Sequence, residues 1–470
     1  MDDILHGGIE LSYLIAASLF IVGLKQLSSP ATARRGNLLA TVGMVLAIAA
    51  TLLYKSSLNY SLIFVGIAVG SAIGVVMARR VEMTDMPQMV GLLNGLGGGA
   101  STLIAMAEFW RILATHELPS AAGIITMILS VLIGGITLTG SLVAFAKLQG
   151  IMSGSAITFP LQRALGIGLL AIFVVSGGYL ILNSGSQAAF LIMLAISLTL
   201  GVLFAIPIGG ADMPVAVSLL NSFSGLAASA AGFVLMNNML IIAGALVGAS
   251  GIILTQIMCK GMNRSLTNVL FTAFNTTKKA ATGGDGTEAE VGDRAVRSVD
   301  SDEASMMLGY AQSVVIVPGY GMAVAQAQHA VRELADQLER LGVDVKYAIH
   351  PVAGRMPGHM NVLLAEANVP YPQLHDMDDI NPEFDHTDVA LVIGANDVVN
   401  PSARHDTNSP IYGMPILEVD KAHHTIVVKR GMNAGFSGVE NELFYKDKTV
   451  MLFGNARDVV TQLVSGLKQL

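Results

Sequence analysis

Nine apolar runs of membrane-spanning length occupy the first 260 residues of this chain. A hydrocarbon layer of ~30 Å is crossed by about 20 apolar helical residues, so each run predicts a transmembrane helix, and the first is the shortest. The runs lie near residues 10–24, 37–54, 61–78, 87–107, 122–146, 165–182, 188–206, 213–235 and 239–259. We therefore expect a multi-span α-helical membrane domain of about nine helices.

Charged residues divide the 470-residue chain into two unlike halves. Residues 1–260 carry only 18 of its Asp, Glu, Lys and Arg residues, although the whole chain has 27 basic and 34 acidic ones. A membrane half therefore precedes a water-soluble half. We place a transmembrane domain at 1–262, a hydrophilic linker at 263–308 and a soluble domain at 309–470. Basic residues gather in alternate loops, so the positive-inside rule puts the N-terminus outside and the soluble domain in the cytoplasm.

Composition also excludes several classes of protein. The single cysteine, Cys259, rules out a framework of internal disulfides. The first residues lack a basic segment, so we expect no cleavable signal peptide. The formal net charge is −7, and no basic cluster stands in the soluble half, so we expect no nucleic-acid partner.

A ten-residue phrase occurs twice, at 85–94 and 212–221, with seven identical positions. Each copy begins Asp-Met-Pro, which predicts a helix start with Asp as N-cap. Nine helical residues place Asn94 and Asn221 about 13 Å further along, near the middle of the bilayer. Amides at that depth often mark an ion or proton path, which would include Asp212. Alternatively, the amides only join helices and the Asp residues only cap them.

The soluble half begins with a nucleotide-binding pattern. A buried strand at 313–317 precedes Gly-x-Gly-x-x-Val at 319–324, and a helical pattern runs over 325–341. Glycines at a strand-to-helix turn let the backbone approach a pyrophosphate, which the helix N-terminus attracts. A plain strand-to-helix turn is the alternative. Further strands are expected at 343–349, 389–393, 424–429 and 449–453. The order predicts a Rossmann-like, doubly wound parallel sheet.

Basic residues at strand ends favour NADP(H). The second strand ends in Ile-His-Pro at 349–351, without the acid that binds an NAD ribose, and Arg355 follows. Lys429 and Arg430 end a later strand and are a second candidate for holding phosphate. The alternative is that they are a solvated pair at the strand end.

Two loops after strands are candidates for function. The glycine-rich stretch 431–438 could fold over a ligand as a lid. Gly-Ala-Asn-Asp at 394–397 follows a strand, where open α/β sheets bind ligands. Its Asp397 is the candidate catalytic carboxylate, with a protonation state that responds to the nucleotide. A simple Asn-Asp turn is the alternative.

Five phrases carry a resemblance to a known family. They are the stretches 318–328, 350–361, 394–397, 428–430 and 209–214. In these, and over nearly its whole length, the chain resembles the β subunit of proton-translocating nicotinamide nucleotide transhydrogenases. The resemblance implies hydride transfer between NAD(H) on a partner α subunit and NADP(H) on this chain, coupled to proton translocation. It also implies the cell inner (plasma) membrane, a dimer of αβ units and no metal site.

The resemblance assigns cofactor contacts residue by residue. Lys429 and Arg430 would hold the 2′-phosphate, and Asp397 would lie near the nicotinamide. The implied cofactor-binding residues are Gly319, Tyr320, Gly321, Met322, Ala323, Val324, Val352, Ala353, Gly354, Arg355, Met356, Pro357, Gly394, Ala395, Asn396, Asp397, Val398, Gly413, Met414, Lys429, Arg430, Gly431, Met432, Asn433, Ala434, Gly435, Phe436, Asn455 and Ala456.

The chain departs from its relatives at two positions. Some relatives carry His where Asn94 stands, and Asn does not titrate, so a His of the partner subunit or a water chain would carry the proton. Many have Ser in place of Gly431, so one phosphate contact would be missing or would come from backbone.

Two other functions compete with transhydrogenation. One is an ion channel or transporter gated by a cytosolic nucleotide-sensing domain. The other is a membrane-anchored dehydrogenase with an organic substrate, although nine spans far exceed what an anchor needs.

Overall fold

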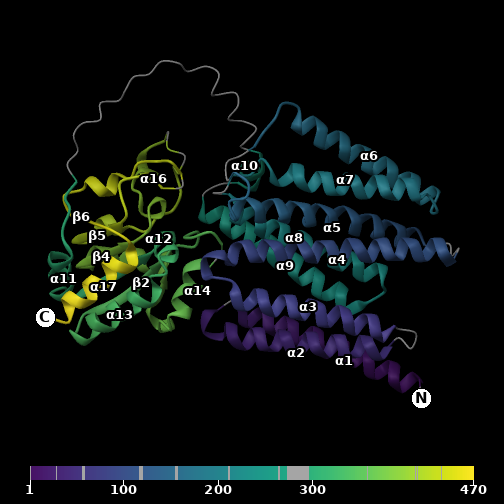
Figure 1. The fold of residues 1–470 in the computed structure, drawn as a ribbon, viewed down its shortest axis with the longest axis horizontal. Helices are drawn as coiled ribbons and strands as arrows, with labels where there is room; N and C mark the ends of the chain where they lie inside the picture. Colours follow the sequence, from purple (N-terminus) through teal and green to yellow (C-terminus); the bar gives the residue numbers. More distant parts are fainter. Residues whose placement is uncertain are drawn as a thin grey trace. The chain divides into compact units, whose positions relative to one another are not determined.

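The chain folds into two compact units, Met1–Gln256 and Ile257–Leu470 (Figure 1). The computed structural model describes residues 2–27, 29–54, 59–115, 120–153, 157–209, 212–262, 265–271, 296–356, 358–407, 409, 411–435 and 437–470. Much of the predicted hydrophilic linker, at residues 272–295, lies outside these ranges.

Long apolar helices make up the first unit. In the described part of the chain, nine of them are long and apolar enough to cross a membrane, which confirms the prediction. They are α1 (Asp2–Leu27), α2 (Pro30–Tyr54), α3 (Tyr60–Arg80), α4 (Met86–Thr115), α5 (Ala121–Leu148), α6 (Gln162–Leu182), α7 (Gln187–Ala205), α8 (Met213–Val234) and α9 (Asn238–Gly261). Helix α4 continues past its predicted end at 107, and an ion pair of 2.7 Å between Glu108 and Arg111 lies on this added turn.

Small residues allow these helices to pack closely. Helix α5 contacts α4, α7 and α8. A Cβ atom on Gly98 of α4 would lie 2.7 Å from the Thr137 Cβ of α5, and one on Gly225 of α8 would lie 2.3 Å from the backbone nitrogen of Gly248. Neither position has room for a side chain, so glycine sets the distance between these helices.

A six-stranded sheet forms the centre of the second unit. All neighbouring strands are parallel, in the order β3-β2-β1-β4-β5-β6. The strands are β1 (Ser313–Pro318), β2 (Asp344–Ile349), β3 (Leu374–Asp376), β4 (Val389–Ile393), β5 (His424–Lys429) and β6 (Thr449–Phe453). The order reverses at β1, as in dinucleotide-binding folds, so the predicted doubly wound sheet is confirmed. Strand β3 was not expected from the sequence, because its three residues, Leu-His-Asp, form no apolar run.

Helices and short turns cover both faces of this sheet (Figure 1). These helices are α11 (Ser301–Gly309), α12 (Tyr320–Val324), α13 (Gln328–Arg340), α14 (His359–Glu366), α15 (Met377–Ile380), α16 (Ser402–His405) and α17 (Ala456–Leu467), while α10 (Leu266–Phe271) precedes them in the chain and does not cover the sheet. Helix α17 packs on α11 and α13. Alternate residues of β1, Val315 and Val317, enter a core with Phe384 and Leu443. The alternate residues Val314 and Ile316 are buried as well, so both faces of the strand are covered.

The helix expected over 325–341 is wrong at its start. Helix α12 already begins at Tyr320. The helical conformation is interrupted at Gln326, which has a positive φ of 49°, and α13 begins at Gln328. The break ends the first helix after little more than one turn, so the glycine-rich turn opens a short helix and not the long one.

Residues 296–309 belong to the folded surface of the second unit. Met451 of β6 donates its N–H to the Arg297 carbonyl and accepts from the Val299 N–H, at 2.8 and 3.0 Å. Helix α11 follows and packs on α17. The predicted linker, 263–308, includes this segment, and its boundaries remain a prediction.

Candidate functional site

The loops after β1 and β4 interlock at the carboxyl edge of the sheet. Gly321 donates its N–H to the Gly394 carbonyl at 2.9 Å, and Gly319 donates to the Ile393 carbonyl at the same distance. A Cβ atom on Gly319 would lie 2.4 Å from the Ala395 nitrogen. Gly394 has a φ of +67°, and its Cβ would lie 2.4 Å from the Gly321 Cα. Only glycines allow this contact, which brings two predicted cofactor-binding segments together where the strand order reverses.

The loop after β2 places Arg355 beside the glycine-rich turn. Its guanidinium carbon lies 4.4 Å from the centre of the Tyr320 ring. Its backbone N–H donates to His359 Nδ1 at 3.0 Å, across a turn in which Gly354 has a φ of +100°. A cation stacked on an aromatic ring keeps a defined position and still presents its N–H donors. Tyr320 and Arg355, two predicted contacts from different loops, are thus in direct contact.

His350 joins this loop to a second one. Its Nε2 lies 2.8 Å from the Pro415 carbonyl, and its Nδ1 accepts the Val352 N–H at 3.2 Å. Burial lowers the pKa of His350 to about 4, so the ring is neutral and Nε2 carries its proton. Pro415 follows Gly413 and Met414, and Gly413 has a φ of +78°. The predicted contacts at 352–356 and 413–414 therefore lie on loops fixed to each other.

Asp397 is bound to the glycine-rich stretch that follows β5. Its Oδ2 accepts the Ser437 N–H at 2.9 Å, and its Oδ1 accepts the Ser437 hydroxyl at 2.8 Å. A Cβ atom on Gly435 would lie 2.5 Å from Asp397 Oδ1, so this glycine is needed for the approach. Sequence reasoning did not assign Ser437 to the site, because no spacing links it to a carboxylate forty residues earlier.

Asn396 presents a buried donor next to Asp397. Its Oδ1 and its backbone carbonyl each accept from Asn441 Nδ2 at 3.0 Å. Its Nδ2 is buried and has no hydrogen-bond partner among the described residues. A buried donor of this kind calls for an acceptor from a ligand or a water. This free donor and the loops of Gly319, Gly321 and Gly394, which have no room for a side chain, fit a bound dinucleotide.

The end of β5 provides the predicted phosphate-binding cations. Lys429 is partly buried, its ammonium donates to the Asn433 carbonyl, and it lies 5.0 Å from the centre of the Phe444 ring. Burial lowers the pKa of Lys429, and the nearby Asp397 charge opposes that shift. Arg430 follows and is exposed. Gly454 donates to the Lys429 carbonyl at 3.0 Å, which brings the predicted contact Asn455 to the same strand end.

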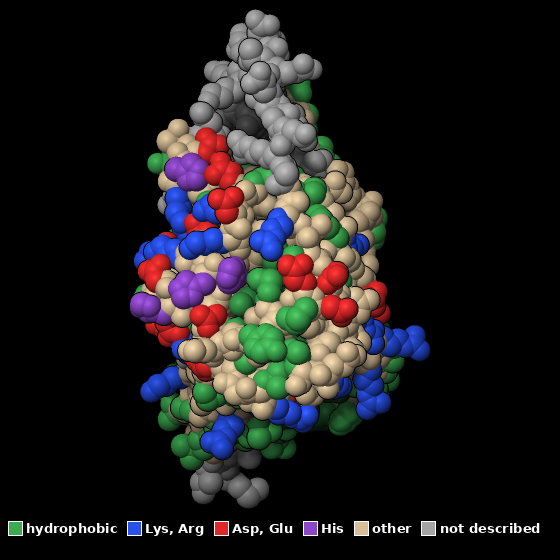
Figure 2. Space-filling view, turned by 90° about the vertical axis from the view of Figure 1, so that its left-hand side faces the viewer, with side chains coloured by type: hydrophobic (Ala, Val, Ile, Leu, Met, Phe, Trp, Pro, Cys, Tyr) green, Lys and Arg blue, Asp and Glu red, His purple; other side chains and the backbone are tan. Residues whose placement is uncertain are grey.

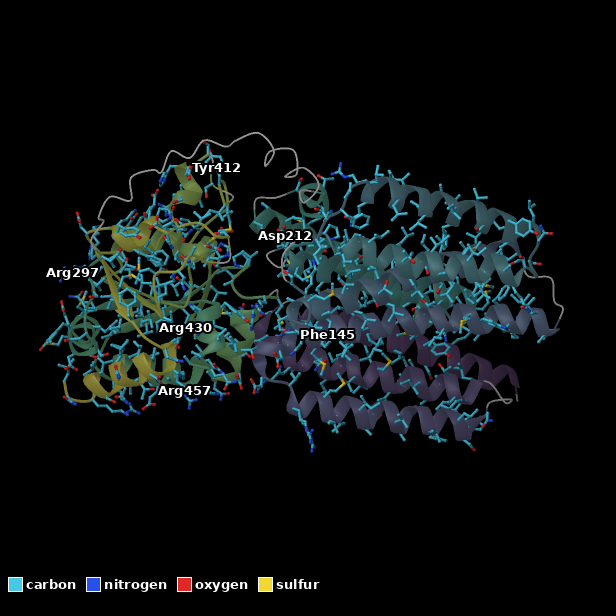
Figure 3. The ribbon with its side chains drawn as sticks, turned by 45° about the horizontal axis from the view of Figure 1, so that its top comes forward. Phe145, Asp212, Arg297, Tyr412, Arg430 and Arg457 are labelled. Atoms are coloured by element: carbon cyan, nitrogen blue, oxygen red, sulfur yellow. The ribbon has the colours of Figure 1, made fainter. Side chains whose placement is uncertain are left out.

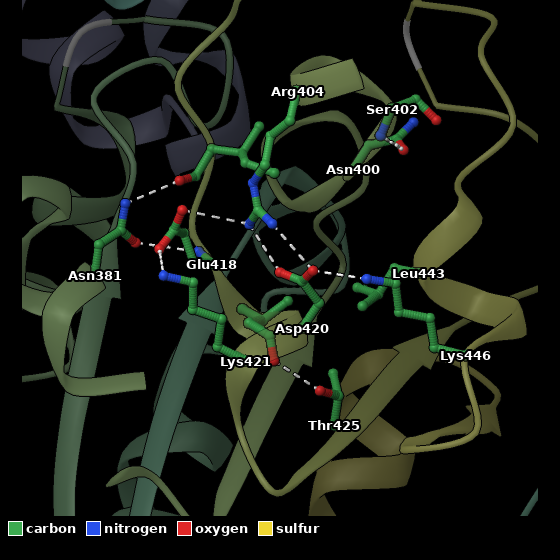
Figure 4. A network of polar contacts seen from close by, with 12 residues as sticks. Asn381, Asn400, Ser402, Arg404, Glu418, Asp420, Lys421, Thr425, Leu443 and Lys446 are labelled. Atoms are coloured by element: carbon green, nitrogen blue, oxygen red, sulfur yellow. Dashed lines mark hydrogen bonds and ion pairs between the residues drawn. The ribbon is translucent and has the colours of Figure 1, made fainter. Parts of the chain in front are cut away.

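A polar network fixes the scaffold behind these loops (Figure 4). Arg404 donates twice to Asp420, at 3.1 and 2.8 Å, and Lys446 donates to the same carboxylate at 2.7 Å. Burial acts to raise the pKa of Asp420, but the hydrogen bonds from Arg404 and Lys446 keep it below its usual value. The network ties α16 to the turns before β5 and β6. Sequence reasoning missed it, since its members are scattered along the chain.

Acidic and basic side chains are mixed on the surface in Figure 2. His side chains lie among them, and hydrophobic side chains occupy part of the same face. This face therefore lacks the continuous positive potential by which proteins attract nucleic acid. Among the described residues, no three His, Cys, Asp or Glu side chains lie together in a way that could hold a metal ion.

In the first unit, Asn94 lies where three helices meet. It is buried, and its Nδ2 donates to Ser141 Oγ of α5 at 3.0 Å. The backbone carbonyl of Asn94 accepts a hydrogen bond from Ser224 Oγ of α8 at 3.4 Å. Asn221 is half-buried and lies three residues before Ser224, so it is on a neighbouring part of the same helix. The two repeated amides thus belong to helices in contact with each other.

The Asp residues of the two phrases differ in their contacts. Asp212 is the N-cap residue of α8, but its side chain makes no capping hydrogen bond. Asp85 ends a short 3₁₀ turn before α4, and its Oδ1 accepts from Gln88 Nε2 at 3.2 Å. Two predicted cofactor contacts, Pro357 and Phe436, lie outside the described residues.

Comparison with known proteins identifies the family. A family model for the NAD(P) transhydrogenase beta subunit matches residues 9–466. The chain belongs to the transhydrogenase β-subunit family. The protein named NAD(P) transhydrogenase subunit beta from Rhodospirillum rubrum is 49% identical over 467 residues, which are 98% of this chain and 99% of that protein. A protein of the same name from one strain of that species matches equally well.

Membership in the transhydrogenase family confirms the predicted function. The chain is a multi-pass membrane protein and a subunit of an enzyme that couples hydride transfer to proton movement. The family acts on NAD(P), and a β subunit implies an α subunit as its partner. The family match decides against the gated channel and the dehydrogenase with an organic substrate.

Proposed function

We propose that this chain binds NADP(H) at the carboxyl edge of its sheet, while NAD(H) binds to the α subunit. The interlocked loops of Gly319, Gly321 and Gly394 carry the proposal, because they open a backbone surface at the point where the strand order reverses. The cations at the end of β5 give this edge a preference for the additional phosphate of NADP(H).

Each group of residues has a distinct task. Lys429 and Arg430 hold the 2′-phosphate, and Arg355, stacked on Tyr320, provides a third cation at the same edge. Asn396 Nδ2 donates a hydrogen bond to the cofactor. Asp397 lies near the nicotinamide and holds the 431–438 stretch through Ser437. The remaining predicted contacts, including Pro357 and Phe436, line the same site.

Bound NADP(H) supplies or accepts the hydride, so the protein needs to provide orientation and a dry site. The hydrogen bonds from Ser437 to Asp397 keep the glycine-rich stretch near the reacting ring. The charge of the nicotinamide ring differs between NADP⁺ and NADPH, so the free energy of a negatively charged Asp397 beside the ring differs as well. The hydrogen bonds that attach residues 431–438 to Asp397 therefore depend on the redox state. Redox state is thereby linked to conformation.

The proton path runs between α4, α5 and α8. Asn94, Asn221 and Asp212 belong to it, with water or a His of the partner subunit carrying the proton. The membrane is the inner (plasma) membrane, the nucleotide unit faces the cytoplasm, and the assembly is a dimer of αβ units. The expected domains are 1–262, 263–308 and 309–470.

Removal of the phosphate-binding charges tests the nucleotide assignment. In the purified αβ complex, Lys429→Gln and Arg430→Gln should each weaken NADPH binding by about tenfold, equivalent to about 1.4 kcal/mol, and leave NADH binding unchanged. Calorimetric titration of both nucleotides gives the comparison. Lys448→Gln, at an exposed lysine just before β6, is the matched control. Equal losses for both nucleotides, or no loss for NADPH, would contradict the assignment.

A further inference from the structure

The last turn of α5 holds a buried lysine whose role is not explained by nucleotide binding. Lys147 is only 5% exposed. Its ammonium donates to the carbonyls of Ile206 and Ile208, at 2.5 and 2.9 Å. Both carbonyls follow the end of α7, where unsatisfied carbonyls give the helix terminus a partial negative charge. These contacts stabilise the ammonium, but removing an ion from water is costly, and an ion within a membrane bundle usually serves function.

Two buried amides at the same end of the bundle have oxygens that are not satisfied. Gln88 donates from Nε2 to the Leu148 carbonyl at 3.4 Å, and Gln162 donates to the Leu203 carbonyl at 3.2 Å. The Oε1 atoms of Gln88 and Gln162 are buried and have no hydrogen-bond partner among the described residues. Buried acceptors of this kind usually bind ordered water. We therefore expect water near the end of α5.

The end of α5 connects both copies of the repeated phrase. Gln88 also donates to Asp85, so the start of α4 is joined to the carbonyl of Leu148. On the other side, Lys147 holds Ile206 and Ile208, which lead along the chain to Asp212 and α8 (Figure 3, where Phe145 and Asp212 are labelled). Helices α4 and α8 carry Asn94 and Asn221. Lys147 thus places a positive charge at the end of the bundle where both α4 and α8 begin.

We propose that Lys147 is the electrostatic gate of the proton path. Its charge repels protons that would otherwise pass through the water at this end of the bundle. Its hydrogen bonds to the carbonyls after α7 also position the start of α8. This inference rests on the proposed proton path between α4, α5 and α8. If Lys147 served only to cap α7, its hydrogen bonds would matter and its charge would not.

Three substitutions separate the charge from the hydrogen bonds. Lys147→Met removes both, Lys147→Gln keeps a donor without charge, and Lys147→Arg keeps both. The αβ complex is reconstituted into liposomes, and passive proton flux without nucleotide is measured together with the protons moved per hydride transferred. Lys147→Met and Lys147→Gln should raise passive flux about tenfold and lower the proton-to-hydride ratio. Hydride exchange in the presence of an uncoupler should stay within about threefold of its original rate.

The controls make the outcome decisive. Lys147→Arg should behave as the unsubstituted complex, as should Lys260→Met, which changes an exposed lysine in the last turn of α9. Tight liposomes and an unchanged ratio with Lys147→Gln would overturn the gate, even if Lys147→Met failed to assemble. Normal pumping by an Asn94→Ala complex would instead contradict the proposed path, so failure of the path and failure of the gate are distinguishable.

Discussion

At the scale of single residues, Asp397 and Ser437 form the contact with the clearest consequence. Both carboxylate oxygens accept hydrogen bonds from this one residue, at 2.9 and 2.8 Å, across forty residues of sequence. The carboxylate therefore has two tasks that substitution can separate. It supplies negative charge near the proposed nicotinamide site, and it holds the glycine-rich stretch after β5.

Asp397→Asn removes the charge but leaves one acceptor oxygen. Hydride transfer should fall about tenfold or more, since charge beside a reacting nicotinamide bears on the transition state, and NADPH affinity should change by less than about threefold. Stopped-flow transfer to an NAD⁺ analogue measures the rate. Ser437→Ala is the matched variant, because it removes only the 2.8 Å bond and keeps the charge. Equal rate losses in the two variants would mean that Asp397 acts only by holding the stretch.

At the scale of elements, backbone contact between two loops defines the edge of the sheet. Gly394 combines a φ of +67° with a Cβ position 2.4 Å from the Gly321 Cα. Any side chain there would be strained by its own backbone and would also separate the loops after β1 and β4. The glycine-rich turn thus depends on a residue more than seventy positions away in sequence.

Gly394→Ala should therefore reduce stability and binding together. Strain in the left-handed region costs about 1–3 kcal/mol, and the separated loops should lower NADPH affinity by about tenfold. Thermal unfolding and NADPH titration of the αβ complex measure the two effects. Gly342→Ala is the control, since Gly342 also has a positive φ, +85°, but nothing lies within 4 Å of a Cβ atom there, so this variant should lose stability and keep its NADPH affinity. If Gly394→Ala bound NADPH normally, the interlocked loops would not be required for the site.

At the scale of the whole molecule, one helix links the polar residues of the membrane unit. Asn94 donates to Ser141 of helix α5, and Lys147 lies in the last turn of the same helix, so the amide's partner and the proposed gate are about six residues apart along it. The Asn94 amide and the Ser141 hydroxyl can order water but do not ionise. Protons would therefore pass only when the conformation brings ordered water to them.

Asn94→Ala should uncouple the two activities of the enzyme. Loss of the amide removes its hydrogen bond to Ser141, so the water it orients should be lost and proton movement should fall about tenfold. Hydride exchange in the presence of an uncoupler should remain within about threefold, because the cofactors carry that chemistry. Reconstituted complex and a pH-sensitive dye give both rates. Ser12→Ala, on the exposed side of α1, serves as control.

Sequence determined much of this protein, because some features are encoded in neighbouring residues. Nine apolar runs predicted the nine membrane-spanning helices of the described part of the chain, since a helix satisfies its backbone hydrogen bonds within one segment. Apolar strand segments and the Gly-x-Gly-x-x-Val turn likewise predicted the parallel sheet and its carboxyl edge. Local patterns failed where the cause was not local. Strand β3 has no apolar run, and the break at Gln326 interrupts a pattern that reads as one helix.

Tertiary structure alone decided which distant residues meet. Three contacts join segments between about forty and seventy residues apart. They are the hydrogen bonds from Ser437 to Asp397, the contact of Gly321 with Gly394, and the hydrogen bonds of Lys147 to the carbonyls after α7. No period or spacing in a single chain records such pairs, because they depend on how whole elements pack. Local chemistry fixed the elements of this protein, and packing fixed the partners of its polar side chains.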